Sequence, residues 1–242
     1  MIKPELLAPA GNLEKLKIAF QFGADAVYMG TPIFGLRKYA PNGSPQELIH
    51  GVEYARKLNK KVYLVLNGFA HDTDLTELSA AAKHIQTINP HALIISDVAV
   101  VEWARTHTEI PIHISTQAST LNWRGCEFWK ALGASRVILG REASVQDCKT
   151  IQSQSDIELE IFVHGAMCAS YSGKCVISNY TSGRDSNRGG CVQTCRHNFV
   201  IEAPSTPSYN SHIMNAKDLM GIDQLPAILD AQIHSLKIEG RM

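Results

Sequence analysis

The chain has 242 residues, 45% of them hydrophobic, which is enough to bury one large core or two small ones. Lys and Arg together number 23, as do Asp and Glu, so no overall positive field marks a nucleic-acid-binding protein, although the balance leaves room for a local basic patch. The N-terminal residues lack the apolar run of a signal peptide and no window is long and apolar enough to span a membrane, so we expect a cytoplasmic protein with no membrane partner.

Short runs rich in Val, Ile and Leu alternate with longer stretches of helical periodicity, a pattern typical of βα units around a parallel, fully buried sheet. In chain order, strands are predicted at residues 5–8, 26–29, 62–66, 92–95, 112–115, 137–140, 159–163 and 235–238. Helices are predicted near residues 12–22, 45–58, 74–88, 98–107, 119–132, 144–154 and 221–231. The second helix has a clear start signal, because Ser44 can cap it and Pro45 suits its first position.

Eight strands with seven intervening helices predict an α/β fold, a TIM-like (β/α)8 barrel over residues 1–242 that is truncated after its eighth strand. A doubly wound open sheet is the alternative, but it usually carries a glycine-rich phosphate turn after its first strand. The turn at residues 8–12 reads Ala-Pro-Ala-Gly-Asn, which is not that fingerprint, so the barrel is favoured. Because no final helix follows the eighth strand, we expect a truncated or cleaved part of a larger protein.

One connection is much longer than the others, and we expect residues 164–215 to be a cysteine-rich, metal-binding insertion after the seventh strand. In a barrel, the loops that leave the C-terminal ends of the strands build the active site. The second part of the insertion, residues 197–215, is predicted to form a hairpin.

The insertion contains four cysteines, separated by six, fifteen and three residues: Cys168, Cys175, Cys191 and Cys195. In a reducing cytosol, such clusters are more often metal ligands or catalysts than disulfides. Only the last pair has the close spacing of a zinc ribbon, and the surrounding glycines can aim backbone amides at sulfur. The spacing therefore favours an iron–sulfur cluster, with structural zinc, then disulfides or free thiols, as alternatives. Cys126 and Cys148 lie in predicted helices and are expected to be buried as small hydrophobes.

The insertion is also locally basic, since one acid, Asp185, stands between residues 164 and 199 against Lys174, Arg184, Arg188 and Arg196. Arginines beside a cofactor can bind phosphates, although a solvated loop explains these charges equally well. Three aromatic residues, Tyr171, Tyr180 and Phe199, can stack on an unpaired base or, as is more common, pack the loop.

Polar residues follow the predicted strands and should converge on one mouth of the barrel. They are Asn67, Ser96, Asp97, Gln117, Arg141, Glu142, His164, Glu239 and Arg241. Any one of them is more often a helix cap or rim residue than a catalyst, so their shared placement carries the argument. The sequence has neither a His-Glu-x-x-His helix nor a Gly-x-Ser-x-Gly elbow, so hydrolytic chemistry has no recognisable nucleophile or metal pair.

Residues 160–178, Glu-Ile-Phe-Val-His-Gly-Ala-Met-Cys-Ala-Ser-Tyr-Ser-Gly-Lys-Cys-Val-Ile-Ser, closely resemble the signature of the peptidase U32 family, the so-called collagenase-like proteases. Further matching segments lie at residues 3–11, 23–28, 113–118, 137–142, 215–219 and 235–241, so the resemblance spans essentially the whole chain. Within the family, the chain looks most similar to the members that take part in tRNA hydroxylation. The resemblance also implies a C-terminal domain beyond this region, so we expect that domain to be absent from residues 1–242.

The resemblance implies an oxygen-sensitive 4Fe–4S cluster on the four clustered cysteines, with tRNA and prephenate as partners. It implies prephenate-linked 5-hydroxylation of a wobble uridine, with an electron donor still to be identified. In some relatives a cluster cysteine follows a Lys-Asp-Leu motif; Met220 stands at that position here, which leaves Cys195 as the fourth ligand. The alternatives are a U32 peptidase, hydroxylation of another RNA or of a quinone precursor, and an accessory RNA-binding protein with a structural metal.

Site residues are expected in two groups. The catalytic group at the mouth comprises Gln117, Arg141, Glu160 and His164. Arg141, with Arg124 or Arg241, is expected to bind the carboxylates of prephenate, because a guanidinium can pair with a carboxylate through two hydrogen bonds. The alternative is that Arg141 pairs with neighbouring acids such as Glu142 or Glu160. The RNA-binding group, expected to contact tRNA phosphates, comprises Arg184, Arg188 and Arg196.

Overall fold

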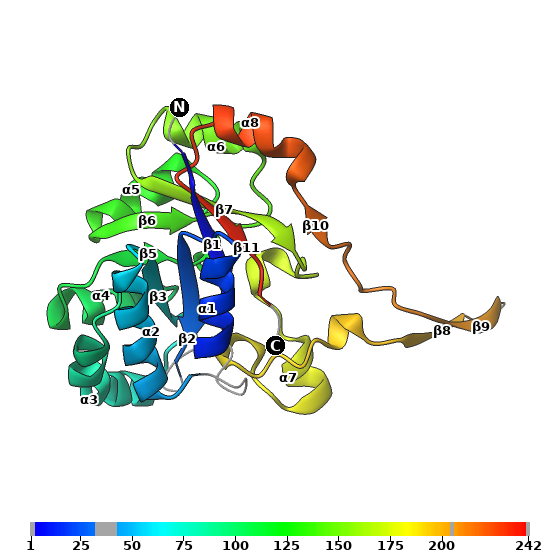
Figure 1. Ribbon diagram of the computed structural model, residues 1–242. Coiled ribbons are helices and arrows are strands. Elements are labelled where there is room, and N and C mark those ends of the chain that lie inside the picture. The colour runs from blue at the N-terminus through cyan, green and yellow to red at the C-terminus, as the bar shows by residue number, and fades with distance from the viewer. Residues whose placement is uncertain (1–2, 32–42, 204–205, 241–242) are drawn as a thin grey trace.

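The computed structural model describes residues 3–31, 43–203 and 206–240, and its main feature is a closed ring of parallel strands surrounded by helices (Figure 1). The ring consists of β1 (Glu5–Pro9), β2 (Ala26–Gly30), β3 (Lys61–Leu66), β4 (Ala92–Ile95), β5 (Ile112–Ile114), β6 (Ala134–Ile138), β7 (Glu158–Gly165) and β11 (Ser235–Ile238). Each strand pairs in parallel with the next, and β11 pairs with β1 to close the ring. The predicted TIM-like barrel is confirmed.

The helices between these strands are α1 (Leu13–Gln21), α2 (Pro45–Lys57), α3 (Asp72–Ile88), α4 (Val98–His107), α5 (Trp123–Ala131), α6 (Val145–Gln152) and α8 (Leu225–Asp230). Their starts follow local chemistry: Ser44 and Glu47 exchange side-chain and backbone hydrogen bonds in a capping box at the start of α2. The fifth helix begins later than predicted, because Ser119 is left-handed (φ 55°) and Asn122 supplies the cap.

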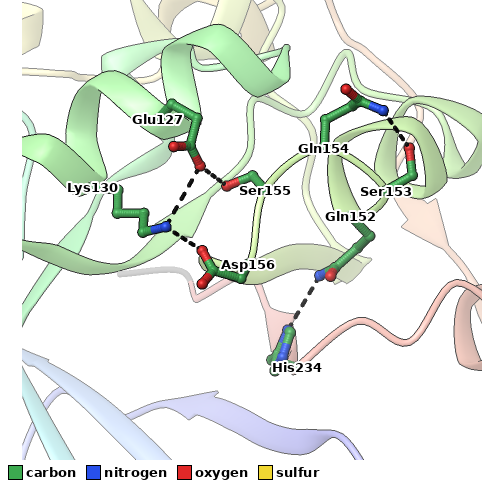
Figure 2. A pocket seen from close by; sticks show the side chains of 8 residues that line it. All are labelled: Glu127, Lys130, Gln152, Ser153, Gln154, Ser155, Asp156 and His234. Carbon is green, nitrogen blue, oxygen red and sulfur yellow. Dashed lines mark hydrogen bonds and ion pairs between the residues drawn. The ribbon is translucent and has the colours of Figure 1, made fainter.

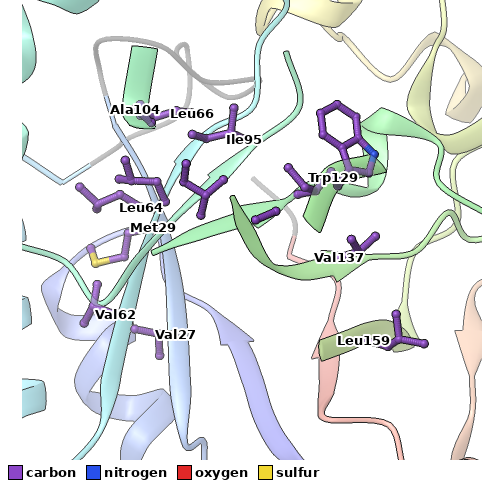
Figure 3. Close-up of a cluster of buried hydrophobic side chains, with 14 of the residues drawn as sticks. Val27, Met29, Val62, Leu64, Leu66, Ile95, Ala104, Trp129, Val137 and Leu159 are labelled. Carbon is purple, nitrogen blue, oxygen red and sulfur yellow. The ribbon is translucent and has the colours of Figure 1, made fainter. Parts of the chain in front are cut away.

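The strands place apolar side chains on both of their faces, as expected for a sheet buried on both sides. Val27, Leu64 and Ile95 belong to the large core between the strands and the helices (Figure 3). The alternate residues Ala26, Tyr63 and Ile94 form a second, smaller cluster. Because successive side chains of a strand point to opposite faces, this second cluster fills the interior of the barrel.

The chain between β7 and β11 leaves the regular βα pattern. It contains the short turns η2 (Tyr171–Gly173), η3 (Ser186–Arg188) and η4 (Thr194–Arg196), the helix α7 (Ile177–Ser182), the strands β8 (Phe199–Ala203), β9 (Thr206–Ser211) and β10 (Leu219–Met220), and η5 (Ile222–Gln224) before α8. The antiparallel pair β8–β9 is the predicted hairpin, and it extends away from the barrel (Figure 1). The short strand β10, which pairs antiparallel with β7, was not predicted. Within the described ranges, the search for a helix that could cross a membrane finds none.

Candidate functional site at the barrel mouth

Three of the predicted catalytic residues lie at the C-terminal ends of neighbouring strands. Gln117 lies in the short turn η1 (Thr116–Ala118) after β5, Arg141 follows β6, and His164 is the penultimate residue of β7. Gln117 is buried, whereas His164 is exposed. These residues therefore share one rim of the barrel, the rim that carries the active site in this fold.

Arg141 is held in place by contacts from two other strands. Its guanidinium forms an ion pair with Glu239, which follows β11, and lies 4.4 Å from the ring centre of Phe162. Both charged side chains are 12% exposed. The sequence had suggested Glu142 or Glu160 as its alternative partners, and the partner observed is Glu239.

Three buried polar atoms at this rim have no hydrogen-bond partner among the residues that the structure describes: Ser96 Oγ, Gln117 Oε1 and Arg141 Nε. They follow β4, β5 and β6, which are adjacent strands. A buried polar group left unpaired costs about 1–3 kcal/mol, so groups of this kind call for a ligand or water. A small polar molecule at the rim could accept a hydrogen bond from Arg141 Nε and donate one to Gln117 Oε1.

Glu160 lies elsewhere, inside the barrel. It is fully buried and accepts hydrogen bonds from Lys237 at 2.9 Å and from Arg136 at 3.2 Å. Arg136 also contacts Glu5, the first residue of β1, at 2.7 Å. The catalytic role predicted for Glu160 stays a prediction. The contacts of Glu160 are those of a side chain that lies in the interior of the barrel. Arg136, Glu160 and Lys237 could have been recognised as a set, because each is a charged residue that stands beside branched apolar residues within a strand.

The four clustered cysteines are free thiols, of which Cys168 and Cys191 are exposed and Cys175 and Cys195 are partly buried. Burial raises the pKa of Cys195; Arg196 opposes this, and the nearby Cys168, Cys191 and Cys175 raise it further. The backbone N–H of Ile177 donates to Cys175 Sγ at 3.3 Å, the kind of contact that tunes iron–sulfur centres. In donor type alone, four thiols are what an iron–sulfur cluster takes. In the described parts of the chain, no group of three or more His, Cys, Asp or Glu side chains is found in an arrangement that could hold a metal ion.

The other two cysteines are buried as predicted. Cys126 on α5 and Cys148 on α6 are 0% and 1% exposed. Burial raises their pKa values to about 12 and about 11, so both stay protonated thiols at neutral pH.

The chain after β7 that contains the four cysteines, residues 164–215, is called the cysteine-bearing segment. It is attached to the rim through the turn between Cys168 and Cys175. The carboxylate of Glu142 accepts hydrogen bonds from the backbone N–H of Ser172, at 2.6 Å, and from its hydroxyl. Gln117 Nε2 donates to the carbonyl of Gly173 at 3.4 Å. No pattern in the sequence indicated this attachment, which brings Ser172 and Gly173, between Cys168 and Cys175 in the chain, to the polar rim.

Two of the predicted phosphate-binding arginines are engaged within the protein. Arg188 pairs with Asp74 of α3 through two nitrogen atoms and donates to the carbonyl of Phe69 at 3.0 Å. Arg196 donates to the carbonyls of Met167, at 2.7 Å, and Ala216, at 2.8 Å, so it joins the two ends of the segment.

The remaining predicted arginines lie at the surface or outside the described residues. Arg184 is exposed beyond the C-terminal end of α7. Arg124 is exposed and stacks on Trp123, with 4.0 Å from its guanidinium carbon to the ring centre. Arg241 lies outside the described residues.

A polar pocket opens at the opposite end of the barrel (Figure 2). It is lined by residues that precede β7 and β11, together with Glu127 and Lys130 of α5. Several of these groups bond to one another: Lys130 pairs with Asp156, and Ser155 donates to Glu127 at 2.6 Å. This end of a TIM-like barrel usually serves stability, so the functional site is assigned to the mouth.

Comparison with known proteins gives a consistent result. Residues 11–242 match the family model described as Peptidase family U32. The chain is similar to a tRNA hydroxylation protein P1 of Bacillus subtilis, with 44% identity over 99% of this chain and 59% of the relative. It is also similar to a tRNA hydroxylation protein P of Escherichia coli, at 36% identity over 100% of this chain and 64% of the relative. A third relative, a 23S rRNA 5-hydroxycytidine synthase of Escherichia coli, is 34% identical over 98% of this chain and 36% of its own length.

The chain thus spans about three-fifths of the length of the two tRNA hydroxylation proteins. Among solved structures, that of a U32 peptidase superimposes with a TM-score of 0.64 over 99% of this chain and 94% of the other. Sequence identity in that pair is 11%, so it supports the fold alone.

Proposed function

The chain belongs to peptidase family U32, and we propose that it takes part in 5-hydroxylation of the wobble uridine of tRNA. The proposal includes a 4Fe–4S cluster on Cys168, Cys175, Cys191 and Cys195, prephenate as co-substrate, and the cytoplasm as its location. One observation carries it: a segment with four free thiols is hydrogen-bonded, through Ser172, to a barrel mouth where three buried polar atoms lack a partner among the described residues. The similarity to tRNA hydroxylation proteins supplies the RNA substrate.

The groups at the mouth suit an acidic co-substrate. A guanidinium binds a carboxylate through two hydrogen bonds, and Arg141 keeps a buried Nε for which the described residues provide no acceptor. The Oε1 of Gln117 can accept a hydrogen bond from a hydroxyl group of the same molecule. His164 stands exposed at the start of the cysteine-bearing segment, where its imidazole can exchange a proton with substrate or solvent.

A cluster bound by the four cysteines would supply one-electron chemistry next to this rim, with structural zinc as the alternative. Of the three predicted RNA-binding arginines, we assign phosphate contact to the exposed Arg184. Arg188 and Arg196 hold the segment in place, because their guanidinium groups already donate to Asp74 and to backbone carbonyls.

The deciding experiment is mass spectrometry of RNA nucleosides from a strain that lacks the gene and from the same strain complemented with it. We expect 5-hydroxyuridine in tRNA to disappear and return. Loss of 5-hydroxycytidine from ribosomal RNA would instead favour the substrate of the rRNA-modifying relative. No change in either nucleoside would contradict RNA hydroxylation and reopen the peptidase alternative.

The ligand assignment is tested by replacing each cysteine with alanine in anaerobically purified protein. Iron content should be lost in the Cys168, Cys175, Cys191 and Cys195 variants, because each removes one of four ligands. Cys126→Ala and Cys148→Ala are matched controls that should retain iron, since both thiols are buried in helices away from the segment. Full iron loading of Cys195→Ala would point to a fourth ligand elsewhere, and zinc in place of iron would support the structural-metal alternative.

A further inference from the structure

The short helix α7 holds an aromatic side chain out into solvent. Tyr180 is 95% exposed, the highest value among the exposed large hydrophobic side chains of the described residues. Exposing a phenol ring forfeits the burial that usually stabilises aromatic side chains, so such a ring often marks an interaction site.

The residues of α7 on either side of Tyr180 are fixed by hydrogen bonds. Ser178, 2% exposed, accepts from the N–H of Val192 at 3.2 Å. Asn179 Oδ1 accepts from the N–H of Ser186 at 3.0 Å, and the hydroxyls of Thr181 and Thr194 are 3.1 Å apart. Turning α7 to bury its ring would break these bonds. Tyr180 is therefore held exposed by the local structure.

The chain segments that flank α7 carry basic side chains, and the helix begins close to Cys175. The N–H of Ile177, the first residue of α7, donates to Cys175 Sγ, so the helix begins beside a cysteine. Lys174 and Arg184 are both exposed on either side of α7. Asp185, the acid nearby, accepts a hydrogen bond from the N–H of Asn187 at 3.0 Å. We call Lys174, Tyr180 and Arg184 the α7 surface.

We propose that the α7 surface binds an unpaired nucleotide of the RNA substrate, with its base stacked on Tyr180 and its flanking phosphates on Lys174 and Arg184. Single-stranded RNA is recognised mainly by stacking on aromatic rings together with cationic contacts to the backbone. The two cations favour a polyanion over an apolar protein partner. The inference rests on the proposed function in taking RNA as the substrate, and it assigns the place where a loop nucleotide is held next to the cysteines.

The test measures binding of an RNA hairpin with an unpaired loop, and of a fully paired RNA duplex, by fluorescence anisotropy. Tyr180→Ala should weaken binding of the hairpin about 10-fold and leave the duplex unchanged, since only unpaired bases can stack. Tyr180→Phe keeps the ring and should bind within about twofold of the wild type. Tyr209→Ala, on the projecting hairpin, removes another exposed tyrosine (59% exposed) and should bind like the wild type.

Unchanged hairpin affinity in Tyr180→Ala would overturn the proposal, as would an equal loss in Tyr209→Ala or on duplex RNA. Mass spectrometry of RNA nucleosides tests the proposed hydroxylation independently of this binding measurement. If hydroxylation is absent but hairpin binding still depends on the ring of Tyr180, RNA binding by the α7 surface is supported and the proposed hydroxylation is contradicted. If tRNA is hydroxylated and Tyr180→Ala binds and reacts like the wild type, RNA binding by the α7 surface is contradicted and the proposed hydroxylation is supported.

Discussion

Arg136 is 4% exposed and contacts three carboxylates. The side chain of Glu160 is fully buried, that of Glu5 is 11% exposed and that of Glu158 is 45% exposed. The nitrogen atoms of Arg136 lie 2.7 Å from Glu5, 2.7 Å from Glu158 and 3.2 Å from Glu160. Lys237 neutralises the other oxygen of Glu160 at 2.9 Å. Removing one member of a buried network leaves its partners charged and desolvated, which costs more than the intact network contributes.

Arg136→Met should therefore destabilise the protein by about 3–5 kcal/mol at neutral pH, because it leaves the buried carboxylates of Glu5 and Glu160 without a guanidinium. Denaturant unfolding followed by circular dichroism measures this change. Lys130→Met is the matched control, since it removes a surface ion pair with Asp156 and should have a much smaller effect. Equal effects of the two substitutions would contradict a stabilising role for the network.

The same network predicts a pH dependence. Burial raises the pKa of Glu5, but Arg136, Tyr63 and Lys61 together outweigh it, so the folded pKa lies below the ordinary 4.5. A carboxyl group with a lowered folded pKa stabilises the fold above its unfolded pKa and loses that contribution as the pH falls through the folded value. In Arg136→Met this contribution is gone, so the gap in unfolding free energy between wild type and variant should narrow on acidification from pH 4.5 downward. A difference in unfolding free energy that stays constant with pH would contradict the assignment of this contribution to Glu5 and Arg136.

At the mouth, Arg141→Lys tests the proposed carboxylate contact. Lysine keeps the positive charge beside Glu239 but cannot bind a carboxylate through two parallel hydrogen bonds. We expect 5-hydroxyuridine to fall sharply while thermal stability and iron content stay close to those of the wild type, measured on the same preparations. Arg105→Lys, in a surface pair with Glu102, is the control. Wild-type levels of 5-hydroxyuridine would remove Arg141 from the site.

Among the elements, the turn at Ser172 joins the first part of the cysteine-bearing segment to the rim of the barrel. Ser172 is fully buried in a left-handed conformation (φ 45°), which is costly for a residue with a side chain. A Cβ on Gly140 would lie 2.6 Å from the hydroxyl of Ser172, so the glycine makes room for the turn. The hydrogen bonds from Ser172 to Glu142 offset this local strain.

Glu142→Ala should therefore loosen the segment while the barrel stays folded. We expect faster hydrogen exchange and easier proteolysis over residues 168–198, with little change in the thermal unfolding of the barrel. Glu127→Ala is the matched control, because that carboxylate also accepts a serine hydroxyl, from Ser155, but at the opposite end of the barrel (Figure 2). Unchanged hydrogen exchange over these residues in Glu142→Ala would contradict the prediction. It would show that other contacts, such as the ion pair of Arg188 with Asp74, are enough to hold the segment on the barrel.

For the whole molecule, periodicity in the sequence was enough to predict the barrel, because each buried strand and its following helix carry a local pattern of apolar residues. The cysteine-bearing segment is different. Its helix α7 consists of Ile-Ser-Asn-Tyr-Thr-Ser, a poor helix former held by hydrogen bonds to residues far along the segment. The pairing of Arg188 with Asp74 joins positions 114 residues apart, which no local pattern records. The sequence therefore indicated where the candidate site lies. It did not indicate which arginines there pair with other parts of the protein, as Arg188 does with Asp74.

The distribution of charge decides how RNA binding should respond to salt. Because the whole chain is neutral, with 23 basic and 23 acidic residues, attraction of RNA must come from local groups whose fields are screened within about 10 Å. A side chain that contacts phosphate releases a counterion, so Arg184→Ala should lower the slope of log affinity against log salt concentration by about one unit. Arg188→Ala removes a guanidinium already bound to Asp74, so it should lower the thermal stability of the segment and leave the slope nearly unchanged. Titrations of tRNA at several salt concentrations measure both slopes, and a larger drop for Arg188→Ala would reverse the two assignments.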